Sequence, residues 1–544
     1  MKKKNRESTF IFLLVFLLFA IFLVMPVIQL LGKSFLGGQG LTFTYYREMF
    51  GSKGFLKTLG NSFFVSSVSG VLATLIAFFL AYSIHYTNIS RKQKVLIRCV
   101  AVLPMLLPTI TYGFAIIYSF GKQGLLTRMF GRQLFEIYGL YGLLLGYVIY
   151  TLPIAFLLIY NTMGYVDKKY MVVSKMMGDS SFATFQMTVL RPLLGTLAAS
   201  FIQSFFLCFT DFGIPASVGG KFEVIASVLY AQMLGSVPNF NKGAVVAIVM
   251  LIPSIISILV LRYLERYNVR YNKISTIEIC KGRGRDWFCG IVSGIFIIGI
   301  LMIFLVIFII PFVADWPYHI LFTWEHIQAV FTDSTLFGVY KNSLWVAVLT
   351  AIAGTLISYG AALVTARSQM SKSVKSIIEG IALVTNTIPG MVIGLAFLFS
   401  FTGTNLQSTF LIMIICNVVH FFSTPYFMMK NSLEKMNASW ETTAMLMGDN
   451  WVKTIIRVVT PNAIATILEV FSYYFVNAMV TVSAVIFIAG ARTMVITTKI
   501  KELQYYNKYN EVFILSLLIL MTNLVAKLLF QYFANRKSKG EKKR

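Results

Sequence analysis

Apolar runs of about 20 residues recur along the whole 544-residue chain. Each run is long enough to cross a hydrocarbon core of about 30 Å as an α-helix. Hydrophobic residues make up 57% of the chain and charged residues 12%, whereas about a quarter of a soluble domain is charged. The pattern predicts an all-α, polytopic membrane protein of about 12 transmembrane helices, at 9–31, 58–86, 95–120, 139–163, 193–218, 241–264, 287–313, 341–366, 375–401, 408–430, 462–489 and 511–534.

Basic residues gather on one side of this predicted topology. The formal net charge of +26 would suggest a nucleic-acid partner in a soluble protein. In a membrane protein, Lys and Arg instead collect in the cytoplasmic loops. Twelve spans place both termini on one side, together with the basic stretches at 1–6 and 536–544. We therefore expect a multi-pass protein in the lipid bilayer with cytoplasmic N- and C-termini, and no nucleic acid bound.

The second half of the chain repeats the first. Polar pairs, mid-span prolines and a Gly-Asp pair recur in the same order, which chance matches between apolar sequences do not readily produce. The matches are Asn61-Ser62 with Asn342-Ser343 and Pro108 with Pro389 at an offset of 281, and Met177-Gly178-Asp179 with Met447-Gly448-Asp449 at an offset of 270.

The duplication predicts two tandem six-helix repeats. Because six is even, the copies run parallel, related by a pseudo-twofold axis along the membrane normal. We expect a first repeat at 1–264, a cytoplasmic linker at 265–286, a second repeat at 287–534 and a basic cytoplasmic tail at 535–544.

Prolines interrupt spans three, four, nine and ten, and a few polar residues lie within or beside spans. Broken helices are tolerated where the backbone faces protein or a water-filled cavity, and ionisable groups at membrane depth are candidates for function. For Asp211, capping of a turn at the outer interface is the alternative, and for Glu469 a structural hydrogen bond. The interrupting prolines are Pro104, Pro108, Pro153, Pro389 and Pro425, and the candidate pathway residues are Asn61, Pro108, Asp211, Asn342, Pro389 and Glu469.

A bent polar segment occurs once per repeat, at 164–192 (the first bent segment) and 431–461 (the second bent segment). The sequences at their centres are MMGDSSFATFQMTVLRP, from residue 176, and LMGDNWVKTIIRVVTP, from residue 446. Gly178 and Gly448 supply the left-handed residue that ends one helix, and Asp179 and Asp449 are expected to cap the next. Such a segment could pack on its own spans, lie on lipid headgroups or enter a groove on a partner. Two equal copies favour a twofold-symmetric partner.

The bent segments resemble the loop that begins Glu-Ala-Ala in permeases of binding-protein-dependent ABC importers. The resemblance covers both halves from about residue 55. The glycine and a later proline match, as Gly178 with Pro192 and Gly448 with Pro461, whereas the Glu-Ala-Ala itself is missing. Glu441 lies one place early in the second copy. The residues that the resemblance assigns to ATPase coupling are Met177, Gly178, Asp179, Phe182, Phe185, Glu441, Met447, Gly448, Asp449, Val452 and Ile455.

The resemblance implies the permease subunit of a bacterial ABC importer in the cell membrane. Two copies of a cytoplasmic ABC ATPase would grip the bent segments, and an extracytoplasmic binding protein would deliver a small molecule or ion. ATP and Mg²⁺ would be bound by the ATPase, and no cofactor, metal or catalytic site is expected on this chain. The nearest phosphate-loop lookalike, at 27–34, lacks the first glycine.

Substrate and energy source are less constrained by the sequence. The stretch FTDFGIPASVGG, from residue 209, resembles permeases for 2-aminoethylphosphonate, ferric ion or thiamine, and the basic external loops favour the anionic phosphonate. An ion-gradient-driven secondary transporter with two parallel six-helix halves is the alternative. It would need no ATPase, and an uncoupler would abolish its uptake. A membrane enzyme is disfavoured because no acid–base cluster is found.

Overall fold

A computed structural model describes residues 6–37, 40–265, 282–437 and 439–541. Most of the predicted linker (266–281) and the last residues of the tail (542–544) therefore lie outside the described residues. Within the described ranges, nine helices are long and apolar enough to cross a membrane, or up to 12 if each of three bent helix pairs is one span. The twelve predicted spans correspond to these nine helices and three pairs.

The described helices form two compact units, and the first of them holds most of the first repeat. This first-repeat unit comprises Tyr46–Asn239 and Ile252–Trp324. Its elements are α4 (Lys53–Tyr86), α5 (Arg91–Val102), η2 (Leu103–Leu106), α6 (Thr109–Phe120), α7 (Leu125–Phe130), α8 (Leu140–Gly164), α9 (Lys169–Met176), α10 (Ser181–Phe185), η3 (Gln186–Leu190), α11 (Arg191–Thr210), α12 (Gly213–Val218), α13 (Ile225–Leu234), α15 (Arg283–Ile309), η4 (Ile310–Phe312) and the antiparallel strands β3 (Val313–Asp315) and β4 (His319–Phe322).

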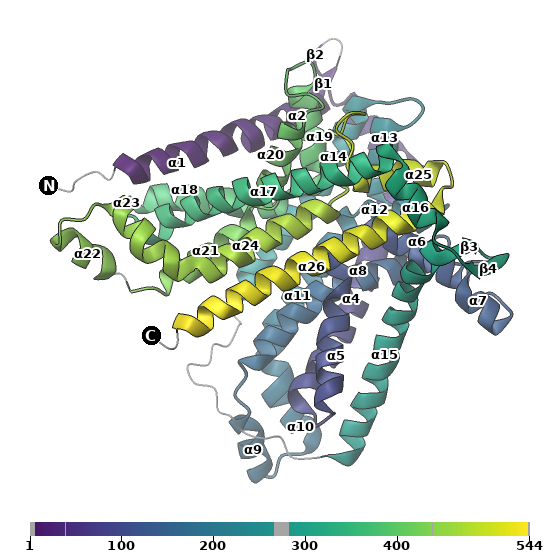
Figure 1. Cartoon of the computed structure of the whole chain (residues 1–544), viewed down its shortest axis with the longest axis horizontal. Helices are drawn as coiled ribbons and strands as arrows, with labels where there is room; N and C mark the ends of the chain where they lie inside the picture. The colour runs from purple at the N-terminus through teal and green to yellow at the C-terminus, as the bar shows by residue number, and fades with distance from the viewer. Residues whose placement is uncertain (1–5, 38–39, 266–281, 438, 542–544) are drawn as a thin grey trace. The chain divides into compact units, whose positions relative to one another are not determined.

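The second-repeat unit comprises Met1–Tyr45, Phe240–Leu251 and Glu325–Arg544. In it α17, α24 and α26 lie side by side (Figure 1). Its elements are α1 (Arg6–Phe19), η1 (Ala20–Val24), α2 (Met25–Phe35), the antiparallel strands β1 (Leu36–Gly37) and β2 (Gly40–Leu41), α16 (Glu325–Thr332), α17 (Ser334–Arg367), α18 (Lys372–Thr387), α19 (Gly390–Phe401), α20 (Phe410–His420), α21 (Ser423–Glu434), α22 (Ser439–Leu446), α23 (Trp451–Thr454), η5 (Ile455–Val459), α24 (Thr460–Val480), α25 (Ile496–Tyr505) and α26 (Tyr509–Glu541). Two helices cross the division between the units, α3 (Thr44–Gly51) and α14 (Phe240–Glu265).

The first span of each repeat packs with the core of the other repeat. The Phe19 ring on α1 lies 4.5 Å from the ring of Phe422 in the second repeat. On α15, the Ser293 hydroxyl donates to the Ser83 hydroxyl at 3.0 Å. The predicted boundaries at 264 and 287 therefore describe the order of the repeats along the chain and not the units in space. Apolar length indicates that a helix spans the membrane, but it carries no information on which bundle that helix joins.

Proline positions explain the bent spans. The helices bend by 113° between Arg91–Leu106 and Thr109–Phe130 and by 105° between Lys372–Thr387 and Gly390–Phe401. Pro108 and Pro389 precede the second helix of each pair. The residue before a proline is forced out of the helical region, so the turn of helix cannot continue through it.

The other two predicted interruptions differ from each other. Span ten bends by 56° just before Ser423–Glu434, which contains Pro425 near its start. In span four the prediction is wrong, because α8 runs unbroken through Pro153. That helix packs against both α4 and α11, and these contacts offset the one backbone hydrogen bond that an internal proline removes.

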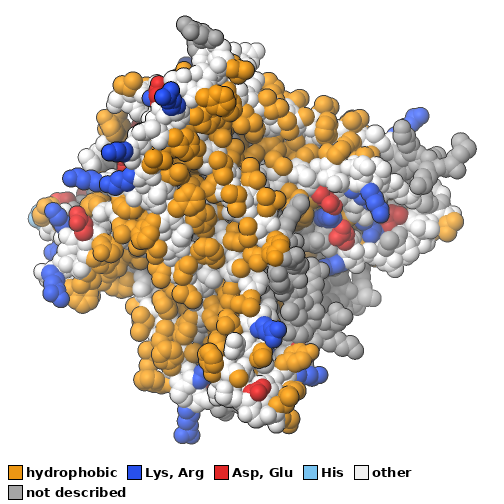
Figure 2. All heavy atoms as spheres, turned by 180° about the vertical axis from the view of Figure 1, so that it is seen from behind, with side chains coloured by type: hydrophobic (Ala, Val, Ile, Leu, Met, Phe, Trp, Pro, Cys, Tyr) orange, Lys and Arg blue, Asp and Glu red, His pale blue; other side chains and the backbone are white. Residues whose placement is uncertain are grey.

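Apolar side chains cover much of the outer surface. On the face seen in Figure 2, hydrophobic side chains cover broad areas. Exposed residues on the long helices include Leu75 on α4 and Trp345 and Leu356 on α17. An apolar surface of this extent requires a lipid or protein environment, in agreement with the span analysis.

Candidate functional site: the paired bent segments

Both bent segments turn at glycine with the same backbone geometry. Gly178 has φ +85° and Gly448 has φ +83°. One residue later, the Asp179 N–H donates to the Ser174 carbonyl at 3.1 Å, and the Asp449 N–H donates to the Ala444 carbonyl at 2.9 Å. These bonds are the six-to-one bond of a Schellman motif, which ends a helix at a left-handed residue. A Cβ on either glycine would meet nothing within 4 Å, so conformation and not space requires glycine here.

The helix after each turn is capped by the residue that follows the aspartate. The Ser180 hydroxyl accepts from the Ala183 N–H at 3.2 Å, and the Asn450 side chain accepts from the Lys453 N–H at 2.8 Å. The prediction that Asp179 and Asp449 cap these helices is therefore wrong by one position. The Schellman bond holds the aspartate backbone, and Ser180 and Asn450 have the extended backbone that a cap needs.

Each turn presents large apolar side chains outward. Met177 is 77% and Met447 80% exposed, and their neighbours Met176, Phe182 and Leu446 are more than 70% exposed as well. Phe185 and Ile455 point the other way. The Phe185 ring packs edge-on against Tyr82 at 5.9 Å, and Ile455 is 5% exposed. The most exposed apolar side chains of each bent segment thus lie at or beside its turn.

A π-helical turn joins each bent segment to the following span. It covers Gln186–Leu190 in the first repeat and Ile455–Val459 in the second. Pro192 and Pro461 follow within two residues. Proline lacks an N–H and crowds the carbonyl four residues earlier, and the wider π turn accommodates both effects. The helix after each turn and the following span therefore form one continuous helical arm in each repeat.

A cavity lies beside the second bent segment. Its volume is about 500 Å³, and Arg6 and Phe10 of α1 line it together with Trp451, Val452 and Ile455. The N-terminal end of α1 and the second bent segment therefore lie at the same end of the second-repeat unit. This agrees with the predicted topology, in which both are on one side of the membrane.

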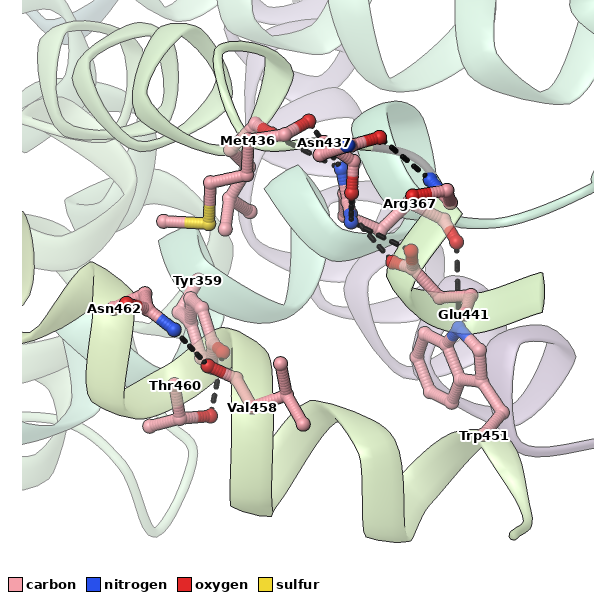
Figure 3. Close-up of polar contacts among 11 residues, drawn as sticks. Tyr359, Arg367, Met436, Asn437, Glu441, Trp451, Val458, Thr460 and Asn462 are labelled. Carbon is pink, nitrogen blue, oxygen red and sulfur yellow. Dashed lines mark hydrogen bonds and ion pairs between the residues drawn. The ribbon is translucent and has the colours of Figure 1, made fainter. Parts of the chain in front are cut away.

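One buried arginine at the end of α17 joins three elements around the second bent segment. Arg367 is the last residue of α17, and its side chain is 3% exposed. Its guanidinium donates to both carboxylate oxygens of Glu441, at 2.5 and 2.6 Å. It also donates to the carbonyls of Met436 and Asn437, at 2.9 and 3.0 Å. Figure 3 shows Arg367, Glu441 and Trp451 directed toward one another, and the Trp451 indole N–H donates to the Arg367 carbonyl at 3.3 Å.

The first bent segment is held differently. Tyr86 stands where the duplication places Arg367, and Met171 where it places Glu441. The Lys168 ammonium lies 5.7 Å from the centre of the Tyr86 ring, and burial, with the nearby Lys94 charge, lowers the pKa of Lys168. Within the segment, the Ser174 hydroxyl donates to Asp179 at 2.5 Å and lies 3.0 Å from the Thr184 hydroxyl. These two hydroxyl contacts stay within the segment, which reaches α4 through the Tyr86 ring and through ring packing of Phe185.

The Asn-Ser pairs make the same contacts in both repeats. The side-chain amides of Asn61 and Asn342 each donate, at 3.1 Å, to a backbone carbonyl (Glu223 and Met494) just before α13 and α25. The neighbouring hydroxyls of Ser62 and Ser343 accept from the first N–H of those helices at 2.7 Å. The structure thus places both asparagines in a tie between the long helix and a short one, and their part in a pathway stays a prediction.

The two predicted acidic residues lie in different settings. Asp211 is buried, and its carboxylate accepts from the Ile214 N–H at 2.9 Å, which matches the turn-capping alternative. Glu469 is on an exposed face of α24, and no ion-pair partner for it is found among the described residues. Arg367 and Trp451 were not predicted. Comparing the repeats position by position would have marked Arg367, because its counterpart is uncharged.

Comparison with known proteins agrees with the duplicated architecture. The profile described as "Binding-protein-dependent transport system inner membrane component" matches residues 73–270 and 354–539. The two matched segments begin 281 residues apart, which is the offset of the Asn-Ser pairs. Each match includes one bent segment.

Three relatives show the range of named transport systems. The ferric transport system permease protein FbpB of Actinobacillus pleuropneumoniae is 23% identical over 89% of this chain and 72% of its own length. A protein of Haemophilus influenzae provisionally named FbpB 1 is 24% identical over 89% of this chain and 78% of its own. The thiamine transport system permease protein ThiP of Salmonella typhimurium is 29% identical over 29% of this chain and 30% of its own. The chain therefore belongs to the family of binding-protein-dependent transport system inner membrane components, as a multi-pass permease subunit of an ABC importer and not an enzyme.

Proposed function

We infer that this chain forms the whole membrane pathway of its importer and that its bent segments bind two cytoplasmic ATPase subunits. The observation that carries this inference is the repeated geometry of the turns, each with a left-handed glycine and an exposed methionine. Two turns of the same form, each with exposed apolar side chains, suit the matching grooves of two identical ATPase subunits. The N-terminus would then be cytoplasmic, because Arg6 lies beside the second bent segment, and an even number of spans would place the C-terminus on the same side.

The mechanism follows from linkage between ATP, substrate and two states of the permease. ATP and Mg²⁺ are bound by the ATPase subunits, whose closure would move both bent segments. Each segment continues through its π turn into a membrane span. A displacement of the glycine turn would therefore displace the helical arm. The balance between inward- and outward-open states shifts only as far as ATP and substrate bind the two states differently.

Ferric ion is the substrate suggested by the relatives that align with most of this chain. The two ferric transport relatives each cover 89% of this chain, whereas the thiamine relative covers 29%. The extracytoplasmic binding protein would carry the ion to the permease. Thiamine and 2-aminoethylphosphonate, the substrate first favoured by loop charge, remain the competing outcomes of the test.

Reconstitution tests the function and the substrate together. The permease is purified together with its ATPase and placed in liposomes. Its binding protein is then added after loading, in separate experiments, with ⁵⁵Fe³⁺, thiamine or 2-aminoethylphosphonate. We expect ATP-dependent ⁵⁵Fe³⁺ uptake that an uncoupler does not reduce. ATP-independent uptake that collapses with the uncoupler would establish a secondary transporter, and uptake of thiamine or the phosphonate alone would refute the substrate assignment.

A further inference from the structure

We propose that Arg367 is a positioning residue that joins the second bent segment to α17, so that the two repeats transmit ATPase movement unequally. This inference rests on the proposed function. The second bent segment would move as one body with α17, whereas the first would transmit its movement through ring packing against α4. The ATPase cycle would then depend far more on the polar contacts of the second repeat.

Geometry makes Arg367 the junction of the second bent segment. Its guanidinium grips Glu441 with two bonds in parallel, an arrangement that fixes orientation as well as distance. The carbonyls of Leu433 on α21, and of Met436 and Asn437 just after it, accept from its remaining donors. Three elements, α17, α21 and α22, are thus fixed to a side chain that is almost fully buried.

A second polar contact lies two helical turns earlier on α17. The Tyr359 hydroxyl is 2.7 Å from the Thr460 hydroxyl at the start of α24 (Figure 3). Residues eight apart lie on about the same face of a helix, so Tyr359 and Arg367 form one polar edge. This edge holds α17 to the second bent segment through Glu441 and to the start of α24 through Thr460.

In the first repeat, different residues occupy all the positions that match this polar edge. Phe78 and Leu190 stand where the offsets place Tyr359 and Thr460, as Tyr86 and Met171 replace the ion pair. Contact there is made by rings, with Phe185 packed edge-on against Phe78 at 6.2 Å and Tyr82 at 5.9 Å. Edge-on ring packing constrains orientation less than a bidentate ion pair does and permits small rotations and sliding. The two repeats therefore share a fold of the turn but differ in how the turn is attached.

Glu441→Gln is the deciding variant, with Met171→Gln as its match in the first repeat. Glutamine keeps the size of the side chain and leaves the Arg367 contacts to the α21 carbonyls in place, so the bundle is expected to fold. In the assembled transporter we expect Glu441→Gln to lower the hydrolysis stimulated by loaded binding protein at least tenfold. Stimulation is expressed per copurified ATPase, and Met171→Gln should change it less than twofold.

Charge exchange provides the second arm. Arg367→Glu alone is expected to abolish stimulation, and Arg367→Glu combined with Glu441→Arg should restore part of it, which a purely structural loss of the arginine would not allow. Normal stimulation in Glu441→Gln, or equal losses in Glu441→Gln and Met171→Gln, would overturn the proposal. Measurement of the wild-type transporter distinguishes a failure of the proposed function from a failure of the role proposed for Arg367. If the wild type shows no stimulated hydrolysis, the proposed function itself is contradicted.

Discussion

Gly448→Val is expected to lower the binding-protein-stimulated ATP hydrolysis of the reconstituted transporter by about tenfold. Gly448 has φ +83°, where a β-branched residue is strained by about 1–3 kcal/mol. Since each 1.4 kcal/mol is about a factor of ten in population, few molecules would keep the docked turn. The measurement compares hydrolysis with and without loaded binding protein.

Gly338→Val is the matched control for this variant. Gly338 lies within α17, and a Cβ there would meet nothing within 4 Å. The same substitution in a regular helix should therefore leave stimulation within about twofold of wild type, since valine and glycine differ little in helix propensity. If Gly448→Val couples as well as Gly338→Val, the turn geometry of the second bent segment is not needed for docking.

Met177→Asp combined with Met447→Asp is expected to remove the ATPase from the purified transporter. Both methionines are more than three-quarters exposed, so the exchange does not disturb the permease core. In a protein groove, each carboxylate would be desolvated without a partner, which costs several kcal/mol per charge. Quantifying the ATPase that copurifies with the permease checks this outcome.

Val237→Asp is the control for the charge exchange. Val237 is 86% exposed in the loop between α13 and α14, far along the chain from both bent segments. It should leave copurification unchanged. Retention of the full ATPase complement by the double methionine variant would mean that the two turns are not the docking surface.

The span pattern and the turns could be predicted from sequence because each depends on local chemistry. Apolar length is set by the thickness of the bilayer, and a left-handed helix end requires a residue such as glycine. Proline before a helix breaks the preceding turn, as at Pro108 and Pro389. The same rule failed at Pro153, where packing within the bundle kept α8 unbroken.

The attachments of the bent segments could not be predicted in the same way. An arginine at the end of a span, such as Arg367, is ordinarily explained by the distribution of basic residues in membrane topology. Its ion pair with Glu441 joins positions 74 residues apart, and only the folded bundle brings them together. The packing of α1 with the second repeat and of α15 with the first likewise depends on the folded bundle. Neither apolar length nor the duplication predicts it.

Photo-cross-linking tests the central claim most directly. A photoreactive amino acid is placed at position 177 or 447 of the full chain, and at position 237 as control, and membranes are irradiated before solubilisation. The proposed docking predicts an adduct between permease and ATPase subunit from both 177 and 447, and none from 237. Probes at 177 and 447 that react only with lipid or with the permease itself would contradict it.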